Sequence, residues 1–135
     1  FLYWVFVHQK EHAFIEFCQR NVVGLSSFTI AEVLYHAHDV PHTFRERFRR
    51  AIKSGLQLVQ IPVPVHPGNP SEEIAYVHSV DPELLQLVPD HSDAVIAALA
   101  VKMHANILTR DKHHLFTVEL ENYFSPKGLL VQNNL

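Results

Sequence analysis

The sequence predicts an α/β protein with a parallel sheet. Short runs rich in β-branched residues alternate along the chain with longer segments in which apolar residues recur at helical spacing, an order typical of strand–helix–strand units. A helix that is apolar nearly all round is also separated from the next strand by a single residue, which makes helix and strand antiparallel neighbours. The predicted strands are residues 21–27, 56–63, 106–110 and 128–132.

The helices between these strands are predicted from apolar spacing and from residues typical of helix ends. Ser27 and Ser71 are the expected N-caps of two of them, because a hydroxyl can accept a hydrogen bond from a free amide of the first turn. Gly55 is the expected end of a third helix. The predicted helices are residues 9–20, 28–38, 42–55, 71–80, 89–105 and 112–124, with a further turn beginning at Asp81.

Composition predicts one globular domain over residues 1–135. The chain is 47% hydrophobic and 19% charged, which provides enough apolar material for a full core and argues against disorder. Its formal net charge of −3 gives no overall basic field. The one cysteine, Cys18, excludes an internal disulfide and suits a reducing compartment, so we expect a cytoplasmic protein. No apolar run is long enough to predict a membrane span.

Carboxylates stand at both ends of the apolar helix and the strand that follows it. Asp90 is the expected N-cap of this helix, and Asp93 lies in its first turn, on an otherwise apolar stripe. Only Ala105 connects the helix to the strand, so the start of the helix and the end of the strand lie at the same edge. We therefore expect Asp93 to face Asp111. Taken singly, Asp93 could instead stabilise the helix dipole, and Asp111 could be an ordinary turn residue.

Glu32 is the third acid predicted at a strand's carboxyl end. It lies one turn into the helix that follows the strand over 21–27, on a stripe that is otherwise apolar, and ligands of open α/β sheets bind at this edge. A carboxylate among apolar groups is costly unless it is paired or bound to a metal, and crowded carboxylates repel one another. Hard oxygen ligands of this kind suit Mg²⁺ or Mn²⁺.

Two blocks of the sequence resemble the PIN domain family, metal-dependent ribonucleases that include the VapC-type toxins of toxin–antitoxin pairs. "SSFTIAEVLY" resembles the block with the family's second acid, which corresponds to Glu32. "SDAVIAALAVKMHANILTRD" resembles the block with the third and fourth acids, which correspond to Asp93 and Asp111, while Thr109 corresponds to the family's small hydroxyl residue. The resemblance covers most of the chain in element order, and the second block is the more specific.

This resemblance implies a three-layer fold in which helices cover both faces of a parallel sheet of four to five strands. It implies a Mg²⁺- or Mn²⁺-dependent endoribonuclease in which Glu32, Asp93 and Asp111 hold the metal and catalyse the hydrolysis of RNA phosphodiester bonds. Thr109 and Asp90 are the expected supporting residues. It also implies the toxin of a type II pair, with an antitoxin protein as partner.

The chain departs from the family at its beginning. The family's first acid lies in an Asp-x-Asn motif that ends the first strand, before a segment like "FLYW", and this motif is absent. The chain lacks an initiating Met and begins within an apolar run. We therefore expect a longer natural chain with one further strand and one further acid upstream of Phe1.

Basic residues predict where RNA approaches. One helix carries five of them, which suit a phosphate track, an arginine site for an acidic partner peptide, or simply a solvated face. Arg110, His113 and His114 beside Asp111 are candidate substrate contacts or solvated residues. The aromatic N-terminus offers more apolar surface than one small core covers, which predicts a homodimer. The five basic residues are Arg45, Arg47, Arg49, Arg50 and Lys53.

Two alternatives to the ribonuclease stay open. "HQKEH" over 8–12 matches a zinc-protease pattern, in which His8 and His12 would share a helix face. The chain holds 11 histidines, so such a match arises easily by chance. The second alternative is a PIN-like binding module whose catalytic site has decayed, a hypothesis supported by the missing first acid.

Overall fold

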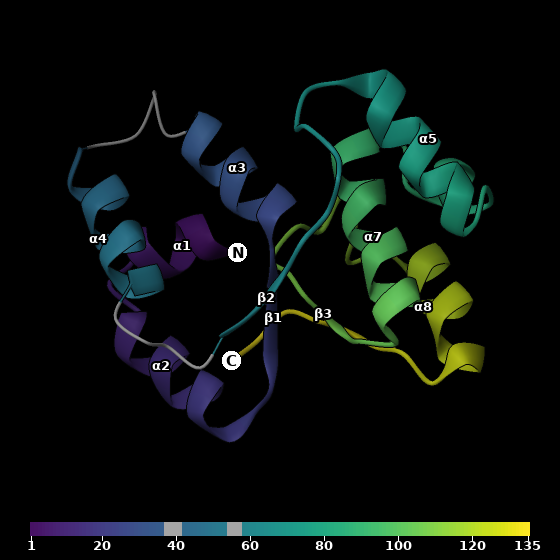
Figure 1. Cartoon of the computed structure of the whole chain (residues 1–135). Coiled ribbons are helices and arrows are strands. Elements are labelled where there is room, and N and C mark those ends of the chain that lie inside the picture. The colour runs from purple at the N-terminus through teal and green to yellow at the C-terminus, as the bar shows by residue number, and fades with distance from the viewer. Residues whose placement is uncertain (37–41, 54–57) are drawn as a thin grey trace. The chain divides into compact units, whose positions relative to one another are not determined.

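A computed structural model describes residues 1–36, 42–53 and 58–135 of the chain (Figure 1). These residues divide into two compact units. The N-terminal unit is Phe1–Pro64 together with Leu135, and the C-terminal unit is Val65–Asn134. Each unit combines helices with one pair of short parallel strands. The α/β class is thus confirmed, whereas a continuous sheet of four to five strands is not shown.

The N-terminal unit packs its helices beside the pair β1 and β2, in which Val23 lies opposite Leu58 and Ser26 opposite Ile61. The predicted strands are present but shorter than expected. The ends predicted at residues 37, 38, 54 and 55, including Gly55, lie outside the described residues. The elements are α1 (Leu2–Val7), α2 (Glu11–Arg20), β1 (Val23–Ser26), α3 (Ser27–His36), α4 (His42–Lys53) and β2 (Leu58–Ile61).

Aromatic rings from α1 and α4 form the centre of this unit's core. Phe6 contacts Phe44 and Phe48 edge-to-face, with ring centroids 5.9 and 5.6 Å apart, a favourable geometry for aromatic pairs. The N-terminal segment therefore supplies core residues, and Leu2 and Val5 are buried with it. Of its large apolar residues, only Tyr3 and Val7 stay exposed. This leaves little of the apolar surface on which the predicted homodimer depends, and the homodimer stays a prediction.

The N-cap predicted for α3 is off by one residue. The hydroxyl of Ser26, at the end of β1, accepts a hydrogen bond from the Thr29 amide at 2.9 Å. Ser27 instead accepts from the Val63 amide at 2.9 Å and ties the helix start to the segment after β2. Both serines can cap a helix, and the backbone course at the end of β1 decides which one does.

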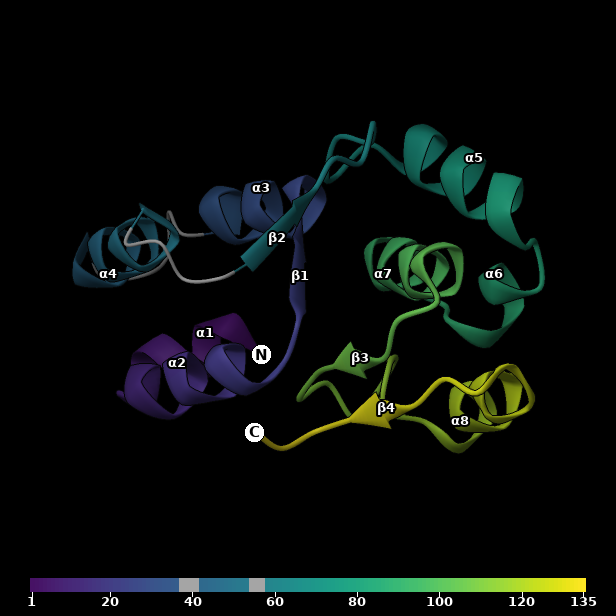
Figure 2. The ribbon, with the colours of Figure 1, turned by 60° about the horizontal axis from the view of Figure 1, so that its bottom comes forward.

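In the C-terminal unit α5 lies beside α7, as both views of the ribbon show (Figures 1 and 2). β3 and β4 pair in parallel, with Ile107 opposite Val131, and the Thr109 amide extends the ladder by donating to the Gln132 carbonyl at 2.8 Å. The elements are α5 (Pro70–Val80), α6 (Leu84–Leu87), α7 (His91–Met103), β3 (Ile107–Leu108), α8 (Val118–Phe124), the 3-10 turn η2 (Ser125–Lys127) and β4 (Val131–Gln132).

Two predictions for this unit are corrected. Asn69, rather than Ser71, caps α5, because its side chain accepts from the Glu72 amide and Pro70 already occupies the first helical position. The helix predicted over 112–124 begins only at Val118, with Thr117 as N-cap. Residues 112–115 form a turn instead, closed by the Phe116 amide on the Asp111 carbonyl at 2.8 Å.

No helix within the described ranges is both long enough and apolar enough to span a membrane.

Candidate metal centre

The first turn of α7 contributes two carboxylates. Asp90 is the N-cap, as predicted, and its Oδ1 accepts a hydrogen bond from the Asp93 amide at 3.1 Å. The alanine-rich helix behind it is buried along most of its length, so the helix start is anchored. Asp93 is half-buried and Asp90 exposed. Both carboxylates therefore belong to one well-defined turn at the edge of the unit.

The chain after β3 delivers the third carboxylate. Thr109 is buried, and its hydroxyl accepts from the Asp111 amide at 3.0 Å, which turns the chain at this point. Asp111 Oδ1 in turn accepts from the His113 amide at 2.7 Å. One oxygen of Asp111 is thus committed to its own turn. The other oxygen, Oδ2, lies 3.4 Å from Nδ1 of His114.

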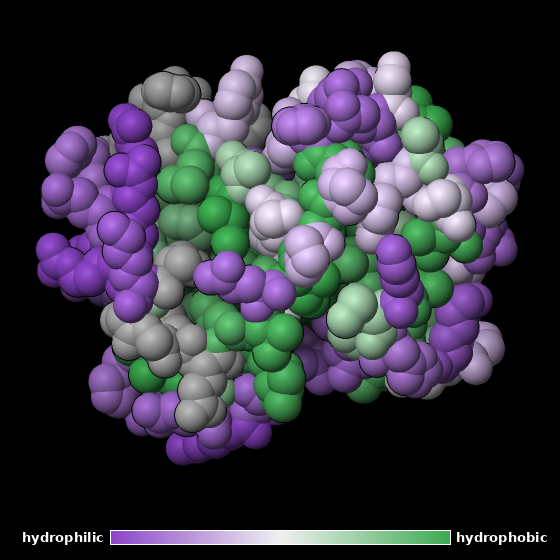
Figure 3. Space-filling model, viewed as in Figure 1, coloured by the Kyte–Doolittle hydropathy of each residue, from purple (hydrophilic) through white to green (hydrophobic). Residues whose placement is uncertain are grey.

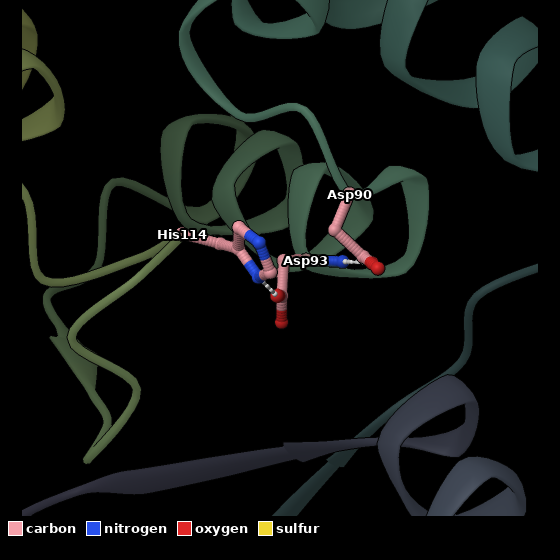
Figure 4. A group of neighbouring side chains, drawn as sticks. All are labelled: Asp90, Asp93 and His114. Atoms are coloured by element: carbon pink, nitrogen blue, oxygen red, sulfur yellow. Dashed lines mark hydrogen bonds and ion pairs between the residues drawn. The ribbon is translucent and has the colours of Figure 1, made fainter.

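The imidazole of His114 lies against Asp93, whose amide donates to Asp90 (Figure 4). Its Nδ1 lies 3.0 Å from Oδ2 of Asp93 and 3.4 Å from Oδ2 of Asp111. Asp93 therefore faces Asp111, as the short connection between α7 and β3 predicts. Ligand atoms of Asp90, Asp93 and His114 all lie within 4.8 Å of one another, and theirs is the metal-ligand cluster found among the described residues.

Crowding changes the protonation of Asp93. Burial raises the pKa of its carboxyl to about 7, and the negative charges of Asp90 and Asp111 add to the effect. The hydrogen bond with His114 opposes this shift without cancelling it. Without a cation, Asp93 therefore holds its proton to a much higher pH than an ordinary aspartate does.

The pKa of the Asp111 carboxyl shifts in the opposite direction. Burial alone would raise the pKa of its carboxyl, but hydrogen bonds from the His113 amide, the Asp93 carboxyl and the His114 amide hold it below the ordinary value. The positive charge of His114 helps when the ring is protonated. The two aspartates thus share one proton, an arrangement typical of carboxylates that are held close together.

Of the predicted ligands, Asp93 belongs to this cluster, Asp111 contacts only its His114 and Asp93, and Glu32 is not among its members. Glu32 is half-buried on α3, in the N-terminal unit, whereas the cluster belongs wholly to the C-terminal unit. The sequence predicted Asp90 as a helix cap and a supporting residue rather than a ligand, and it predicted His114 as a substrate contact or a solvated residue. The signal for His114 was its position three residues after Asp111, which becomes meaningful only when residues 112–115 form a turn.

The predicted basic residues lie mainly on the outer side of α4, which is hydrophilic in Figure 3. Arg47, Arg49, Arg50 and Lys53 are exposed, and Arg47 lies 3.4 Å from Glu11. Arg45 is half-buried, and its Nε is buried without a hydrogen-bond partner among the described residues. Arg110 is exposed beside Asp111. The helix therefore presents a basic face.

The zinc-protease pattern is not realised. His8 ends α1, Gln9 adopts a left-handed conformation with φ of 53°, and α2 begins only at Glu11. His8 and His12 therefore cannot chelate an ion from one helix face. His12 is exposed and lies 3.5 Å from Glu16 instead.

Comparisons with protein-family models, with curated proteins and with solved structures yield no match for this chain.

Proposed function

We propose that the C-terminal unit binds a divalent metal ion and that the protein uses it to hydrolyse RNA phosphodiester bonds, as the PIN resemblance implies. The observation that carries the proposal is the convergence of Asp90, Asp93 and His114 on one point, with Asp111 on the same imidazole nitrogen. The PIN-like three-layer fold, the role of toxin with an antitoxin partner, and the cytoplasmic location belong to the same proposal.

The donor set fits a divalent cation. The pKa of Asp93 is raised first by burial and then by the negative charges of Asp90 and Asp111, and a bound cation would offset both effects. Carboxylate oxygens suit Mg²⁺ and Mn²⁺, whereas an imidazole nitrogen suits transition metals. Mn²⁺ accepts both kinds of ligand, so we expect it to bind more tightly than Mg²⁺. Asp90, Asp93 and His114 would hold the ion, with Asp111 beside it.

A divalent ion at this point would polarise the scissile phosphate and lower the pKa of the attacking water. The protein's own groups fix where this happens. The Thr109 hydroxyl and the His113 amide hold the backbone and one oxygen of Asp111, so its second oxygen keeps facing the cluster. Arg110, exposed next to Asp111, adds positive charge for a phosphate, which three uncompensated carboxylates would otherwise repel.

Glu32 and the basic face of α4 enter the proposal through the resemblance and through their charge. Glu32 is proposed as a further acid of the reaction. The exposed residues Arg49, Arg50 and Lys53, together with Arg45 and Arg110, are proposed to contact RNA, because phosphate contacts supply most sequence-independent affinity.

The test is metal binding and RNA cleavage by matched variants. Wild type should bind Mn²⁺ in calorimetric titration and cleave a fluorogenic single-stranded RNA in a reaction that EDTA stops. Asp93→Asn should lose both properties. Glu119→Gln, a change of an exposed acid on α8, should lose neither.

Two results would count against the proposal. A wild-type protein that binds no divalent ion and cleaves no RNA would favour the binding module with a decayed site. Cleavage that survives EDTA but is lost in His114→Gln would replace the metal with His114 as general base, since a neighbouring carboxylate can orient an imidazole for that role.

A further inference from the structure

Glu73 is the one charged side chain that is buried among the described residues, with 3% of its surface exposed. It lies near the start of α5 and has no place in the chemistry proposed above. Burying a carboxylate is costly unless hydrogen bonds compensate it, so its position requires an explanation. Its partners provide one. Oε1 accepts hydrogen bonds from the Gly68 amide at 2.9 Å and from the Ser92 hydroxyl at 3.0 Å.

Ser92 connects Glu73 to the candidate metal centre. It immediately precedes Asp93 in the first turn of α7, the turn that carries both Asp90 and Asp93. Helix starts are prone to fray because their first amides have no partner within the helix. The bond from Ser92 to a buried oxygen on α5 therefore restrains the rotation and position of this turn.

The Gly68 amide donates to the same oxygen of Glu73. Gly68 has a φ of +81°, in the left-handed region that favours glycine, and its amide points at Glu73 as a consequence. Glu73 Oε1 is thus restrained by the loop before α5 and transmits that restraint to α7. The packing of α5 on α7 keeps the two helices together.

We propose that Glu73 is a positioning residue of the metal centre: through Ser92 it holds Asp90 and Asp93 where one ion can reach both. This inference rests on the proposed metal site. Glu73 touches neither the ion nor the substrate in this scheme. Groups that orient metal ligands typically contribute about ten- to a hundredfold to metal affinity.

The experiment measures Mn²⁺ affinity by electron paramagnetic resonance, at a temperature where circular dichroism shows every variant folded. Glu73→Ala and Ser92→Ala should each weaken binding about ten- to a hundredfold. Glu73→Gln keeps an oxygen that can accept both hydrogen bonds, and it should bind within a few-fold of wild type. The double variant of Glu73→Ala with Ser92→Ala should bind no more weakly than Glu73→Ala alone, because both changes remove the same link.

Ser79→Ala is the matched control. The Ser79 hydroxyl lies on the same helix and donates to the Tyr76 carbonyl at 2.6 Å, so its loss removes a hydrogen bond without touching α7. It should leave Mn²⁺ affinity unchanged. If Glu73→Ala fails to fold, Ser92→Ala carries the test.

The inference is overturned if Ser92→Ala and a folded Glu73→Ala lower the melting temperature but keep Mn²⁺ affinity within twofold of wild type. It is also overturned if Glu73→Gln binds as weakly as Glu73→Ala, since hydrogen-bond positioning would then not be the mechanism. Wild type that binds no Mn²⁺ removes the proposed metal site and this inference together, which distinguishes failure of the site from failure of the positioning role alone.

Discussion

The two units share a local plan, a short strand ending in a buried hydroxyl, but they use that hydroxyl differently. In the N-terminal unit, Ser26 ends β1, and its hydroxyl accepts from the Thr29 amide to begin α3. In the C-terminal unit, Thr109 follows β3, and its hydroxyl accepts from the Asp111 amide to form a turn. One hydroxyl starts a helix, and the other directs a carboxylate at its neighbours. The residues that follow the strand decide between these outcomes.

The acids of the two units differ in the same way. Glu32 and Asp93 both lie in helices near a strand's carboxyl end, and each is half-buried. Asp93, however, has Asp90, Asp111 and His114 around it, and its pKa rises to about 7. Asp93 is thus a candidate metal ligand because further carboxylate and imidazole atoms lie close to its own carboxylate.

The largest expected effect separates Asp111 from Glu32. Asp111→Asn should reduce RNA cleavage by about a hundredfold, because it removes the carboxylate that lies 3.4 Å from Nδ1 of the proposed ligand His114. The loss of RNA cleavage in Glu32→Gln should be at least about tenfold smaller than in Asp111→Asn, since the groups around the ion in our proposal all belong to the C-terminal unit. Initial rates with the fluorogenic RNA measure both. Equal losses would place Glu32 in the metal centre, as the PIN resemblance implies, and would break the contrast between the units.

The next effect concerns the core of the N-terminal unit. Phe48→Ala removes a side chain that is 1% exposed and should lower the free energy of unfolding by about 3–5 kcal/mol. Urea denaturation measures the loss. Tyr3→Ala, at a position that is 53% exposed, should lower the free energy of unfolding much less. Mn²⁺ affinity of Phe48→Ala, measured where the variant is folded, should stay within twofold of wild type; a large drop would show that the site depends on both units.

The third effect follows from the raised pKa of Asp93. The pKa is about 7 in the folded protein against an ordinary 3.8, so the folded state binds more protons between these values, and the stability that Asp93 contributes falls as pH rises from 4 to 7. Asp93→Asn does not titrate. In EDTA at pH 7.5 it should be more stable than wild type by on the order of 1–3 kcal/mol, allowing for screening at a half-buried site.

Thermal melts across this pH range test the sign of the effect. The extra stability of Asp93→Asn over wild type should shrink towards zero near pH 4. Saturating Mn²⁺ should reverse the difference, because it stabilises wild type alone. Glu119→Gln should show neither trend. An Asp93→Asn protein that is less stable than wild type at pH 7.5 would contradict the crowding argument.

The smallest effect tests the basic face of α4. Replacing Arg49, Arg50 and Lys53 together with Gln should reduce the slope of log affinity against log salt concentration by about two, since each contact with single-stranded nucleic acid contributes about 0.7. Fluorescence anisotropy in an inactive Asp93→Asn background measures it, with Arg20→Gln as an exposed basic control on α2. An unchanged slope would leave α4 as a solvated face or as a site for an acidic partner.

Local patterns predicted most elements, and the errors have local causes. Apolar spacing identified α4 and α7, because a helix that buries one side carries its signal every turn. Helix starts were less certain where two capping residues are adjacent, as at Ser26 and Ser27, or where Asn69 and Pro70 precede Ser71. The turn after Asp111 was read as helix because its residues have no strong preference of their own, and its closing hydrogen bond joins residues five apart.

The meeting of Asp93 and Asp111 was determined by the sequence alone. A buried helix joined to a strand by so short a connection must run back along it, so the start of one and the end of the other share an edge. Glu73 and His114 were decided only by the tertiary structure. Their contacts join residues 19 and 21 positions apart, Glu73 with Ser92 and His114 with Asp93, across separate elements. No periodicity encodes such contacts, because they depend on how α5, α7 and the turn after β3 pack in three dimensions.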